Sequence, residues 1–316
     1  KNMTSKIIIE ESYKRISSYI HKTPILTSET FNNHFNSKLF FKCENFQKSG
    51  SFKIRGAINS ILQLSQKELD RGVITTSSGN HGAALSLAGK IKNTKVIVIM
   101  PENTSITKIK NVQRYGGEII FCDSTFEARQ GMLESINKKK KMSYISPFDN
   151  YNVIAGQGTA ALELIESIPN LDAIIAPISG GGLLSGTILA SKQLNPNIKI
   201  YGAEPINADD AYQSIKAGKI IKTINSDTIA DGLRAQIGEL TFPIINENIN
   251  KIITVSESAI VECMKIVWQR LKIIIEPSCS VVLGALIKNK DEFKNKKVGL
   301  ILSGGNVDLD NLPWLN

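Results

Sequence analysis

The stretch that decides the fold is Ser49-Gly50-Ser51-Phe52-Lys53-Ile54-Arg55-Gly56-Ala57. Residues 38–44 before it alternate in the manner of a strand, and the serines and glycine that open it are turn and helix-cap residues. Apolar side chains then recur at helical spacing as far as residue 61. Lys53 is therefore expected at a strand–turn–helix junction, where the backbone holds it in place.

A lysine among apolar neighbours has a lowered pKa, because burial disfavours its charged form. Its neutral amine can then form a Schiff base with a carbonyl compound. The alternative is an ordinary surface lysine that opens a helix, and this stretch alone leaves both interpretations of Lys53 open.

Length and composition indicate a globular protein. The 316 residues allow one large or two modest domains, and the 42% hydrophobic and 21% charged residues are an ordinary balance. No apolar run approaches the roughly 20 residues that span a membrane. Residues 1–5 lack a signal-peptide core, so we expect a cytoplasmic protein.

The cysteines and the charge exclude two other classes of function. No C-x-x-C pair occurs among Cys43, Cys122, Cys263 and Cys279, so we expect reduced, buried cysteines and no zinc site. The formal charge is +9, but aromatic residues are only 6% and do not interleave with the lysines. We therefore expect solvated basic faces and no nucleic-acid binding, while anionic small molecules remain suitable ligands.

Apolar runs and helical patterns alternate along the chain. Strands are expected at residues 72–76, 96–101, 118–122, 172–178, 199–203 and 298–303. Helices are expected at residues 5–20, 28–35, 54–69, 83–88, 106–115, 125–139, 158–168, 183–194 and 257–272. Continuous apolar strands that alternate with helices are typical of parallel sheets covered on both faces.

The expected fold is thus α/β, with two open parallel-sheet domains and the active site in the cleft between them. We assign residues 1–71 and 149–316 to a large cofactor-binding domain and residues 72–148 to a small domain. The polar turns Ser77–Gly82, Ser179–Gly182 and Ser303–Asn306 each follow a strand. Ligands of open α/β sheets bind beyond the carboxyl ends of the strands, so these turns should converge with Lys53.

The glycine turn has two interpretations. Backbone N–H groups of Ser179–Gly182, at the start of a helix, could bind a phosphate. Alternatively, Gly180-x-Gly182-x-x-Ser185 approximates a dinucleotide fingerprint, with Glu204 as the ribose-binding acid of an NAD-dependent dehydrogenase. The missing third glycine, and the absence of any role for Lys53, speak against the second interpretation.

The other turns also carry polar groups with more than one interpretation. Ser77–Gly82 could hold a carboxylate or a phenolic oxygen, and Ser303 could bond a ring nitrogen. Glu204 and Asp210, with a backbone carbonyl between them, suit a hard cation such as Mg²⁺ or Ca²⁺. Capped helix starts or plain turns would account for each of these patterns alone.

Four motifs in this order carry a family resemblance: Ser51–Ala57, Ser77–Gly82, Ile154–Thr159 and Ser303–Leu309. Together they resemble the pyridoxal-phosphate enzymes of the tryptophan-synthase β-like class (fold type II). Within that class the chain is similar to the serine racemases and the serine/threonine dehydratases, over nearly its whole length. Residues 204–210 and 228–232 look more like the racemases.

The resemblance implies a role for each matching residue. Lys53 would bind pyridoxal 5′-phosphate covalently and then act as a base, and Ser78 would stand opposite it across the cofactor. The cofactor would be held by Phe52, Asn80, Ser179, Gly180, Gly181, Gly182, Leu183 and Ser303. The substrate carboxylate would be held by Ser77, Asn80 and His81, with Arg129 nearby. A divalent cation (Mg²⁺, Ca²⁺ or Mn²⁺) would bind Glu204, Asp210 and the Ala208 carbonyl.

The resemblance also implies an activity. It points to a homodimeric enzyme that interconverts L- and D-serine and eliminates serine to pyruvate and ammonia. The alternative is a dehydratase of L-serine, L-threonine or 3-hydroxyaspartate without racemisation, because residues 146–149 look like the dehydratase version of that loop.

Activation by ATP is the weakest part of the resemblance. Lys48, Ser49 and Tyr115 match a nucleotide site at the dimer interface of the mammalian racemases. Ala83 stands where those enzymes carry glutamine, which weakens the case for ATP as an activator.

Overall fold

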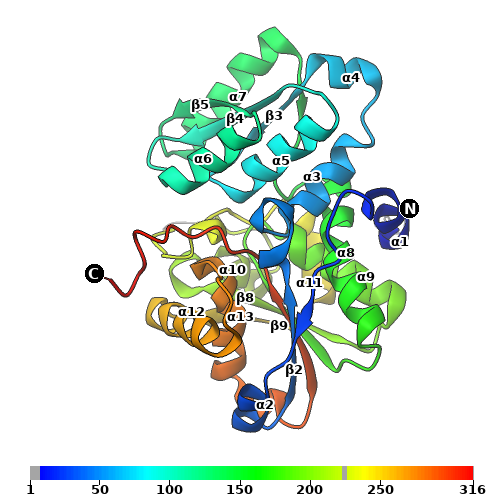
Figure 1. The fold of residues 1–316 in the computed structure, drawn as a ribbon, viewed down its shortest axis with the longest axis vertical. Helices are drawn as coiled ribbons and strands as arrows, with labels where there is room; N and C mark the ends of the chain where they lie inside the picture. The colour runs from blue at the N-terminus through cyan, green and yellow to red at the C-terminus, as the bar shows by residue number, and fades with distance from the viewer. Residues whose placement is uncertain (1–7, 223–225, 316) are drawn as a thin grey trace.

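The chain forms two α/β units, each built around one sheet (Figure 1). The structure is a computed structural model that describes residues 8–222 and 226–315. In the six-stranded sheet the order is β1 (Ile25–Leu26), β2 (Lys38–Cys43), β10 (Lys297–Leu302), β7 (Ala173–Pro177), β8 (Lys199–Pro205) and β9 (Lys251–Val255). In the four-stranded sheet it is β5 (Glu118–Cys122), β4 (Val96–Pro101), β3 (Val73–Thr76) and β6 (Ser143–Tyr144).

All neighbouring strands are parallel except β1 and β2, so the predicted fold class is confirmed. Every strand of the smaller sheet lies within residues 73–144, inside the predicted small domain. The domain boundaries themselves stay a prediction. Strand β10, from the end of the chain, lies between β2 and β7, so the junction before Lys53 is built into the centre of the larger sheet.

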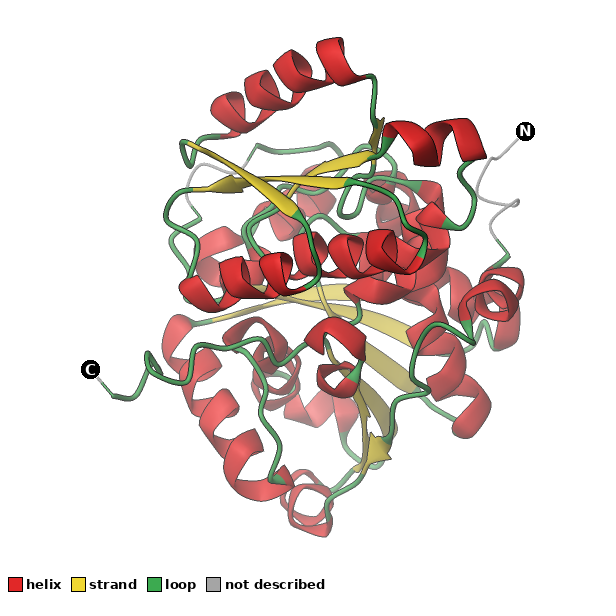
Figure 2. Cartoon of the chain, turned by 45° about the horizontal axis from the view of Figure 1, so that its top comes forward, coloured by secondary structure: helices red, strands yellow, loops and turns green. Residues whose placement is uncertain are grey.

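Strand β4 of the four-stranded sheet is buried on both faces. Val96 and Val98 of β4 pack with Leu85 of α5 (Asn80–Ile91). Ile97 and Ile99 pack on the other face with Leu133 of α7 (Phe126–Lys140). Figure 2 shows helices both above and below this sheet. Alternate burial on two faces explains why the strand reads as a continuous apolar run.

Three helices pack closely beside the larger sheet: α3 (Lys53–Ile61), α8 (Tyr151–Ser167) and α9 (Gly182–Leu194). A Cβ on Gly156 would lie 2.5 Å from the Arg55 carbonyl oxygen, and one on Gly158 would lie 2.7 Å from that of Gly186. The prediction that α8 begins at residue 158 was wrong, because these glycines serve helix contact and not a turn.

One long predicted helix, residues 54–69, is two helices, α3 and α4 (Gln66–Arg71). Ser65 and Glu68 form a capping box that starts α4, a signal that the sequence carried. The first predicted helix is shorter than expected: α1 covers Ile9–Ile16, and residues 5–7 lie outside the described residues.

The remaining elements complete the two units. Those predicted within a few residues are α2 (Glu29–Phe35), α6 (Ile106–Arg114) and α12 (Glu257–Leu271). Those not predicted are the strands β1, β6 and β9, and the helices α10 (Asp210–Ala217), α11 (Thr241–Asn248), α13 (Pro277–Lys288) and α14 (Lys290–Phe293). Short 3₁₀ turns lie at Glu44–Phe46 (η2), Lys48–Gly50 (η3), Ile206–Ala208 (η4) and Asp231–Leu233 (η5).

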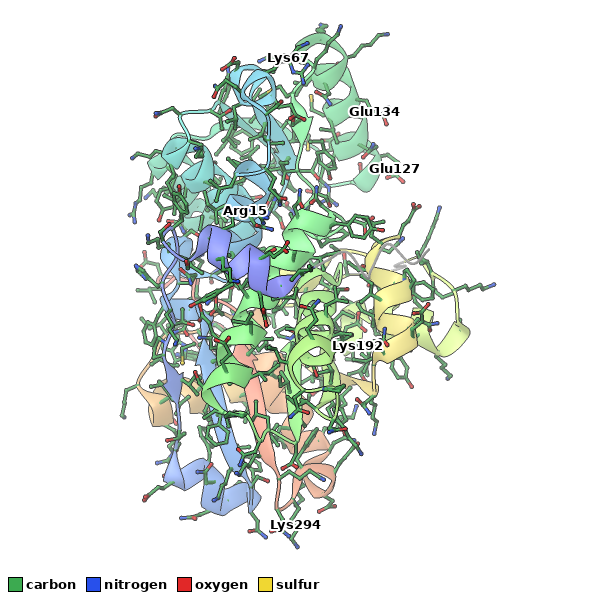
Figure 3. All side chains as sticks on the ribbon, turned by 90° about the vertical axis from the view of Figure 1, so that its right-hand side faces the viewer. Arg15, Lys67, Glu127, Glu134, Lys192 and Lys294 are labelled. Carbon is green, nitrogen blue, oxygen red and sulfur yellow. The ribbon has the colours of Figure 1, made fainter. Side chains whose placement is uncertain are left out.

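The positions of the charged side chains and of the cysteines agree with what the composition predicts. Charged side chains such as Lys67, Glu134 and Lys294 lie at the periphery of the molecule (Figure 3). All four cysteines are buried and free, as predicted. Among the helices of residues 8–222 and 226–315, none has the length and apolar character needed to cross a bilayer.

The end of the chain packs back on α12. Trp314 meets Trp268 in a T-shaped contact, with ring centroids 5.2 Å apart. The indole N–H of Trp268 donates to the Ile275 carbonyl at 2.9 Å. This contact fixes the segment that leads into α13.

Candidate active site

Lys53 is the first residue of α3, at the junction that the sequence predicted. The Phe52 N–H donates to the Ser303 carbonyl at 3.0 Å, and Ser51 forms an antiparallel bridge with Gly304. The turn that follows β10 is therefore bonded directly to the turn that carries Lys53. Ser303 itself is buried at the end of β10.

The Lys53 amine is half-buried and donates to the Pro147 carbonyl at 2.9 Å. Its nitrogen lies 5.1 Å from the centroid of the Phe52 ring. Burial lowers the pKa of Lys53 to about 8, against the opposing charge of Glu276. An amine with this pKa is neutral in a useful fraction of molecules near neutral pH, which suits a nucleophile or base.

The glycine turn is shaped by an aromatic ring on the segment that contacts Lys53. A Cβ on Gly180 would lie 2.2 Å from the Phe148 ring, so only glycine fits there. Gly181 has a φ of 94° and precedes the first residue of α9. No described residue accepts a hydrogen bond from the N–H groups of residues 179–181. Free N–H groups at a helix start are the donors that a phosphate needs.

The side chain of Ser179 is occupied in this turn. Its hydroxyl donates to the Ala235 carbonyl and accepts from the Ala235 N–H, both at 2.9 Å. Only the backbone of Ser179 is therefore available to an anion. Leu183, in the first turn of α9, is buried and packs in the adjoining apolar core.

The turn of residues 77–82 presents a hydroxyl and an imidazole from the other sheet. The Ser77 hydroxyl oxygen accepts from Gly79 N–H at 3.1 Å and Gly82 N–H at 2.9 Å. His81 is buried, and its Nε2 lies 3.2 Å from the Ile145 carbonyl, so Nε2 carries the proton. Burial, and next the charge of Lys53, lower the pKa of His81 to about 3. Its Nδ1 is an acceptor with no partner among the described residues.

Ser78 differs from its neighbours because it is exposed. Asn80 joins the two sheets: its Nδ2 donates to Glu276 Oε1 at 2.6 Å, and its Oδ1 accepts from Asn306 Nδ2 at 3.0 Å. Asn306 Nδ2 also donates to the Ser49 carbonyl at 2.8 Å. The turns at 49–53, 77–82 and 303–306 thus converge, as predicted.

Glu276, Lys108 and Asp231 also belong to the site, and the sequence pattern predicted a role for none of them. Asp231 was noted only within residues 228–232, which look like the racemases. Lys108 Nζ lies 2.5 Å from Asp231 Oδ2 and 3.7 Å from Glu276 Oε2. Burial raises the pKa of Glu276 to about 7, although Lys108 opposes this rise. Lys108 passes beneath the 77–82 turn, because a Cβ on Gly79 would lie 2.4 Å from its Cδ. A glutamate directly before Pro277 at a helix start was the one available signal.

Arg129 is not brought to this site by any contact of the described residues. It lies on α7, half-buried, and its Nε donates to the Thr125 carbonyl of the same helix at 3.4 Å. Its predicted role beside the substrate carboxylate stays a prediction.

Glu204 and Asp210 are both buried and lie beside the 3₁₀ turn that contains Ala208. The Glu204 carboxylate accepts from the N–H groups of Ala211 at 3.0 Å and Tyr212 at 2.8 Å. Burial, and next the charge of Asp210, raise the pKa of Glu204. Within the described residues no group of three or more His, Cys, Asp or Glu could hold a metal, so a cation here would need the backbone carbonyl.

The profile of the family described as "Pyridoxal-phosphate dependent enzyme" matches residues 16–304. The chain belongs to this family. The dehydrogenase alternative therefore fails, and the Glu204 carboxylate instead caps the start of α10.

Relatives within the family are similar over almost the whole chain. A serine racemase of Dictyostelium discoideum is 52% identical and covers 96% of this chain and 95% of its own sequence. A solved maize serine racemase has a TM-score of 0.93 and 45% identity, over 97% of this chain and 94% of that one. A beta-hydroxyaspartate dehydratase of Paracoccus denitrificans is 43% identical, over 96% of both sequences.

The residues present fit pyridoxal phosphate. Lys53 supplies an amine of lowered pKa, and residues 179–181 supply unused N–H groups. Ser51 Oγ and His81 Nδ1 are buried polar atoms that have no hydrogen-bond partner among the described residues. Such atoms are costly to bury unless a ligand completes their bonds.

Proposed function

We propose that this chain is a serine racemase that interconverts L- and D-serine and also eliminates serine to pyruvate and ammonia. The observation that carries the proposal is that Lys53 begins α3 and that Ser78, a second group able to carry a proton, lies in the turn whose Asn80 bonds Glu276 and Asn306. The serine racemases among the relatives, 52% and 45% identical, support it.

Bound pyridoxal phosphate supplies a carbonyl for the substrate amine and an electron-withdrawing ring that acidifies the α-carbon. Lys53, with a pKa of about 8, takes the α-proton. Ser77 orients the substrate carboxylate: its oxygen already accepts two N–H groups, so its own proton remains to be donated. His81 stays neutral near pH 7 and adds no charge.

The two reactions differ in what happens after the α-proton is taken. Racemisation needs a second group that delivers a proton to the opposite face, and we assign this role to Ser78 from the family resemblance and from its place in the turn beside Asn80. Elimination needs only loss of the β-hydroxyl as water, after which the enamine product hydrolyses to pyruvate and ammonia. Lys53 serves both reactions, and Ser78 serves one.

A dehydratase of L-serine, L-threonine or 3-hydroxyaspartate is the second candidate. The specific observation in its favour is the segment 146–149, which lies against the glycine turn. The Asp149 carboxylate accepts from Leu240 N–H at 2.8 Å and Glu239 N–H at 3.2 Å, and the Ser146 hydroxyl accepts from Asp149 N–H at 2.9 Å. The dehydratase relative supports this alternative as well.

We further propose a divalent cation, Mg²⁺ by preference over Ca²⁺ or Mn²⁺, at Glu204, Asp210 and the Ala208 carbonyl. Two buried carboxylates that raise each other's cost of ionisation favour a cation between them. ATP activation is not expected, because Ala83 is buried and offers no polar group.

A cytoplasmic homodimer that acts on small amino acids is the expected form. The dimer rests on family resemblance and on two exposed apolar side chains, Phe46 and Ile274, that lie on adjoining segments. Asn45 Nδ2 donates to the Ile274 carbonyl at 3.0 Å, which brings these segments together.

The test follows D-serine and pyruvate in one reaction of purified protein with pyridoxal phosphate, Mg²⁺ and L-serine. D-serine formed at a rate comparable with pyruvate is the expected result. Pyruvate alone would favour the dehydratase, and L-threonine and 3-hydroxyaspartate would then be compared as substrates. Neither product from any of the three would overturn both candidates.

A further inference from the structure

Four charged side chains lie together in the interior, away from the turns that bind substrate. Lys42, Glu44, Arg55 and Glu163 have relative exposures of 0% each. We call them the buried quartet. They come from β2, the 3₁₀ turn after it, α3 and α8.

Arg55 is the centre of the buried quartet, and all five of its N–H groups are used. Nε and Nη2 donate to the two oxygens of Glu44 at 2.7 and 2.8 Å. Nη1 and Nη2 donate to the two oxygens of Glu163, both at 2.9 Å. The fifth bond runs from Nη1 to Thr159 Oγ1 at 3.1 Å. A planar guanidinium held by two forks has a single orientation.

Each carboxylate of the quartet also accepts a hydrogen bond from a residue other than Arg55. Thr23 Oγ1 donates to Glu44 Oε1 at 2.6 Å, and Lys42 Nζ donates to Glu163 Oε2 at 2.5 Å. Although burial alone would raise it, Arg55 brings the pKa of Glu44 below its ordinary value. Glu44 is therefore held ionised beside Arg55, and the formal charges of the quartet cancel.

Such a cluster is not needed for stability. Buried ion pairs are commonly matched or exceeded in stability by apolar side chains of similar volume, because burial removes each ion from water. What they add is orientation, since only one arrangement satisfies every bond. The question is which part of the chain this orientation serves.

The position of Arg55 indicates which part of the chain this orientation serves. It lies two residues after Lys53, in the first turn of α3. Two further contacts fix the same turn against α8: the Gly56 N–H donates to Gln157 Oε1 at 3.0 Å, and a Cβ on Gly156 would lie 2.5 Å from the Arg55 carbonyl oxygen. The start of α3 is thus bonded to the 3₁₀ turn after β2 on one side and to α8 on the other.

We propose that Arg55 is a positioning residue for the reaction: through its double fork to Glu44 and Glu163 it fixes the start of α3 and so the place of the Lys53 amine. This inference rests on the proposed function, because it takes Lys53 as the amine that binds the cofactor and moves the proton. The action is geometric, since the quartet has no net charge and Lys53 responds to burial and to Glu276.

The test uses two variants of the network and two matched controls. Arg55→Lys keeps the charge and loses both forks. Thr159→Val keeps both forks and removes the neutral fifth bond, together with the bond that the Thr159 hydroxyl donates to the Gly156 carbonyl, and it is the second variant if Arg55→Lys does not fold. Lys42→Met is the control within the quartet, because Lys42 touches Glu163 and not Arg55. Leu286→Ala is a control for loss of core packing alone, at the far end of α13.

The readouts are thermal unfolding, the rate at which pyridoxal phosphate attaches to the apoprotein (followed by visible absorbance), and kcat and KM. For Arg55→Lys we expect attachment and kcat to fall about tenfold to a hundredfold, as for a displaced reacting group. KM should stay within about twofold of the wild type. Thr159→Val should show a smaller fall of the same kind. Lys42→Met, which keeps both Arg55 forks, should reduce attachment and kcat much less than Arg55→Lys does, and Leu286→Ala should lower only the unfolding temperature.

Variants that unfold earlier but attach the cofactor and turn over like the controls would overturn the inference. The proposed function fails separately, because a wild-type protein that takes up the cofactor at Lys53 but forms no product contradicts only the activity. The attachment rate would still decide the role of Arg55 in that protein.

Discussion

Lys53 and Ser78 reach the site from different sheets, and their surroundings differ. The Lys53 turn is joined to the larger sheet through Phe52 and Ser303, and its helix is fixed by the fully bonded Arg55. Ser78 is exposed in a turn that the Ser77 hydroxyl closes. The proposed base therefore lies on a turn that is bonded on several sides, whereas the proposed second proton carrier lies on an exposed turn.

Charged and amide side chains connect the smaller unit to the larger unit at Glu276. Asn80 and Lys108, from the smaller unit, both reach Glu276 of the larger unit. Unlike the buried quartet, this cluster leaves Glu276 Oε2 without a hydrogen bond among the described residues. A complete network fixes a position, and an incomplete one leaves polar capacity where a ligand binds. Four predictions test this difference between the two regions.

Replacing Lys53 should have the largest effect. Lys53→Ala removes the amine from the fixed side, so the visible absorbance of the lysine-bound cofactor and both activities should be lost. Absorbance spectra with assays of D-serine and pyruvate measure this, and Lys48→Ala is a control on the same segment. Retained lysine-bound absorbance would contradict the assignment of Lys53.

Ser78→Ala should separate the two reactions. Loss of the second proton carrier should lower racemisation about 10²- to 10⁴-fold, the usual range for one acid–base group, and lower elimination from L-serine much less. The two products are measured in the same reaction. An equal loss of both would mean that Ser78 only binds substrate, which is the behaviour expected of Ser77→Ala.

Glu276 should make the apoprotein less stable as pH rises. The folded protein holds the Glu276 proton up to about pH 7, whereas the unfolded chain releases it near pH 4.5, so the folded state binds more protons between these values. The free energy of unfolding should therefore fall across that window, by up to about 3 kcal/mol.

Chemical denaturation at pH 5 and pH 8 measures that fall. Glu276→Gln should reduce it, and Glu292→Gln, which changes a more exposed carboxyl, should leave it in place. A wild-type fall that persists in Glu276→Gln would show that another group titrates.

The smallest effect concerns the Lys53 amine itself. The rate of cofactor attachment should rise with pH and level off above a midpoint near 8, because only the neutral amine reacts. The charge of Glu276 raises the pKa of Lys53, so Glu276→Gln should move the midpoint to lower pH. A midpoint that stays in place or moves upward would remove Glu276 from the electrostatics of Lys53.

The sequence predicted the parts of the fold that depend on local pattern. Apolar runs located β4, β5 and β7, and turn residues after strands located the three segments that meet at Lys53. It failed where glycine has a tertiary role: Gly156 and Gly158 lie inside α8 because other helices approach there. It also overlooked a local signal, the Ser65–Glu68 capping box that divides α3 from α4.

The site residues that the sequence did not predict were missed for a different reason. Lys108 lies on an amphipathic helix where a buried lysine looks like any surface lysine, and its partners are 123 and 168 positions away along the chain, at Asp231 and Glu276. Only the packing of the smaller unit on the larger one brings these charges together. No periodicity within either segment records that contact.

The T-shaped pair Trp268 and Trp314 gives the molecule a built-in optical probe. These are the two tryptophans of the chain, and their rings are 5.2 Å apart, close enough for their excited states to couple. Tryptophan emission and near-ultraviolet circular dichroism therefore report on the docking of the last residues onto α12. Because Trp268 is bonded to the residue before Glu276, quenching of that emission by an ultraviolet-absorbing cofactor would register occupancy from within the native chain, with no label attached.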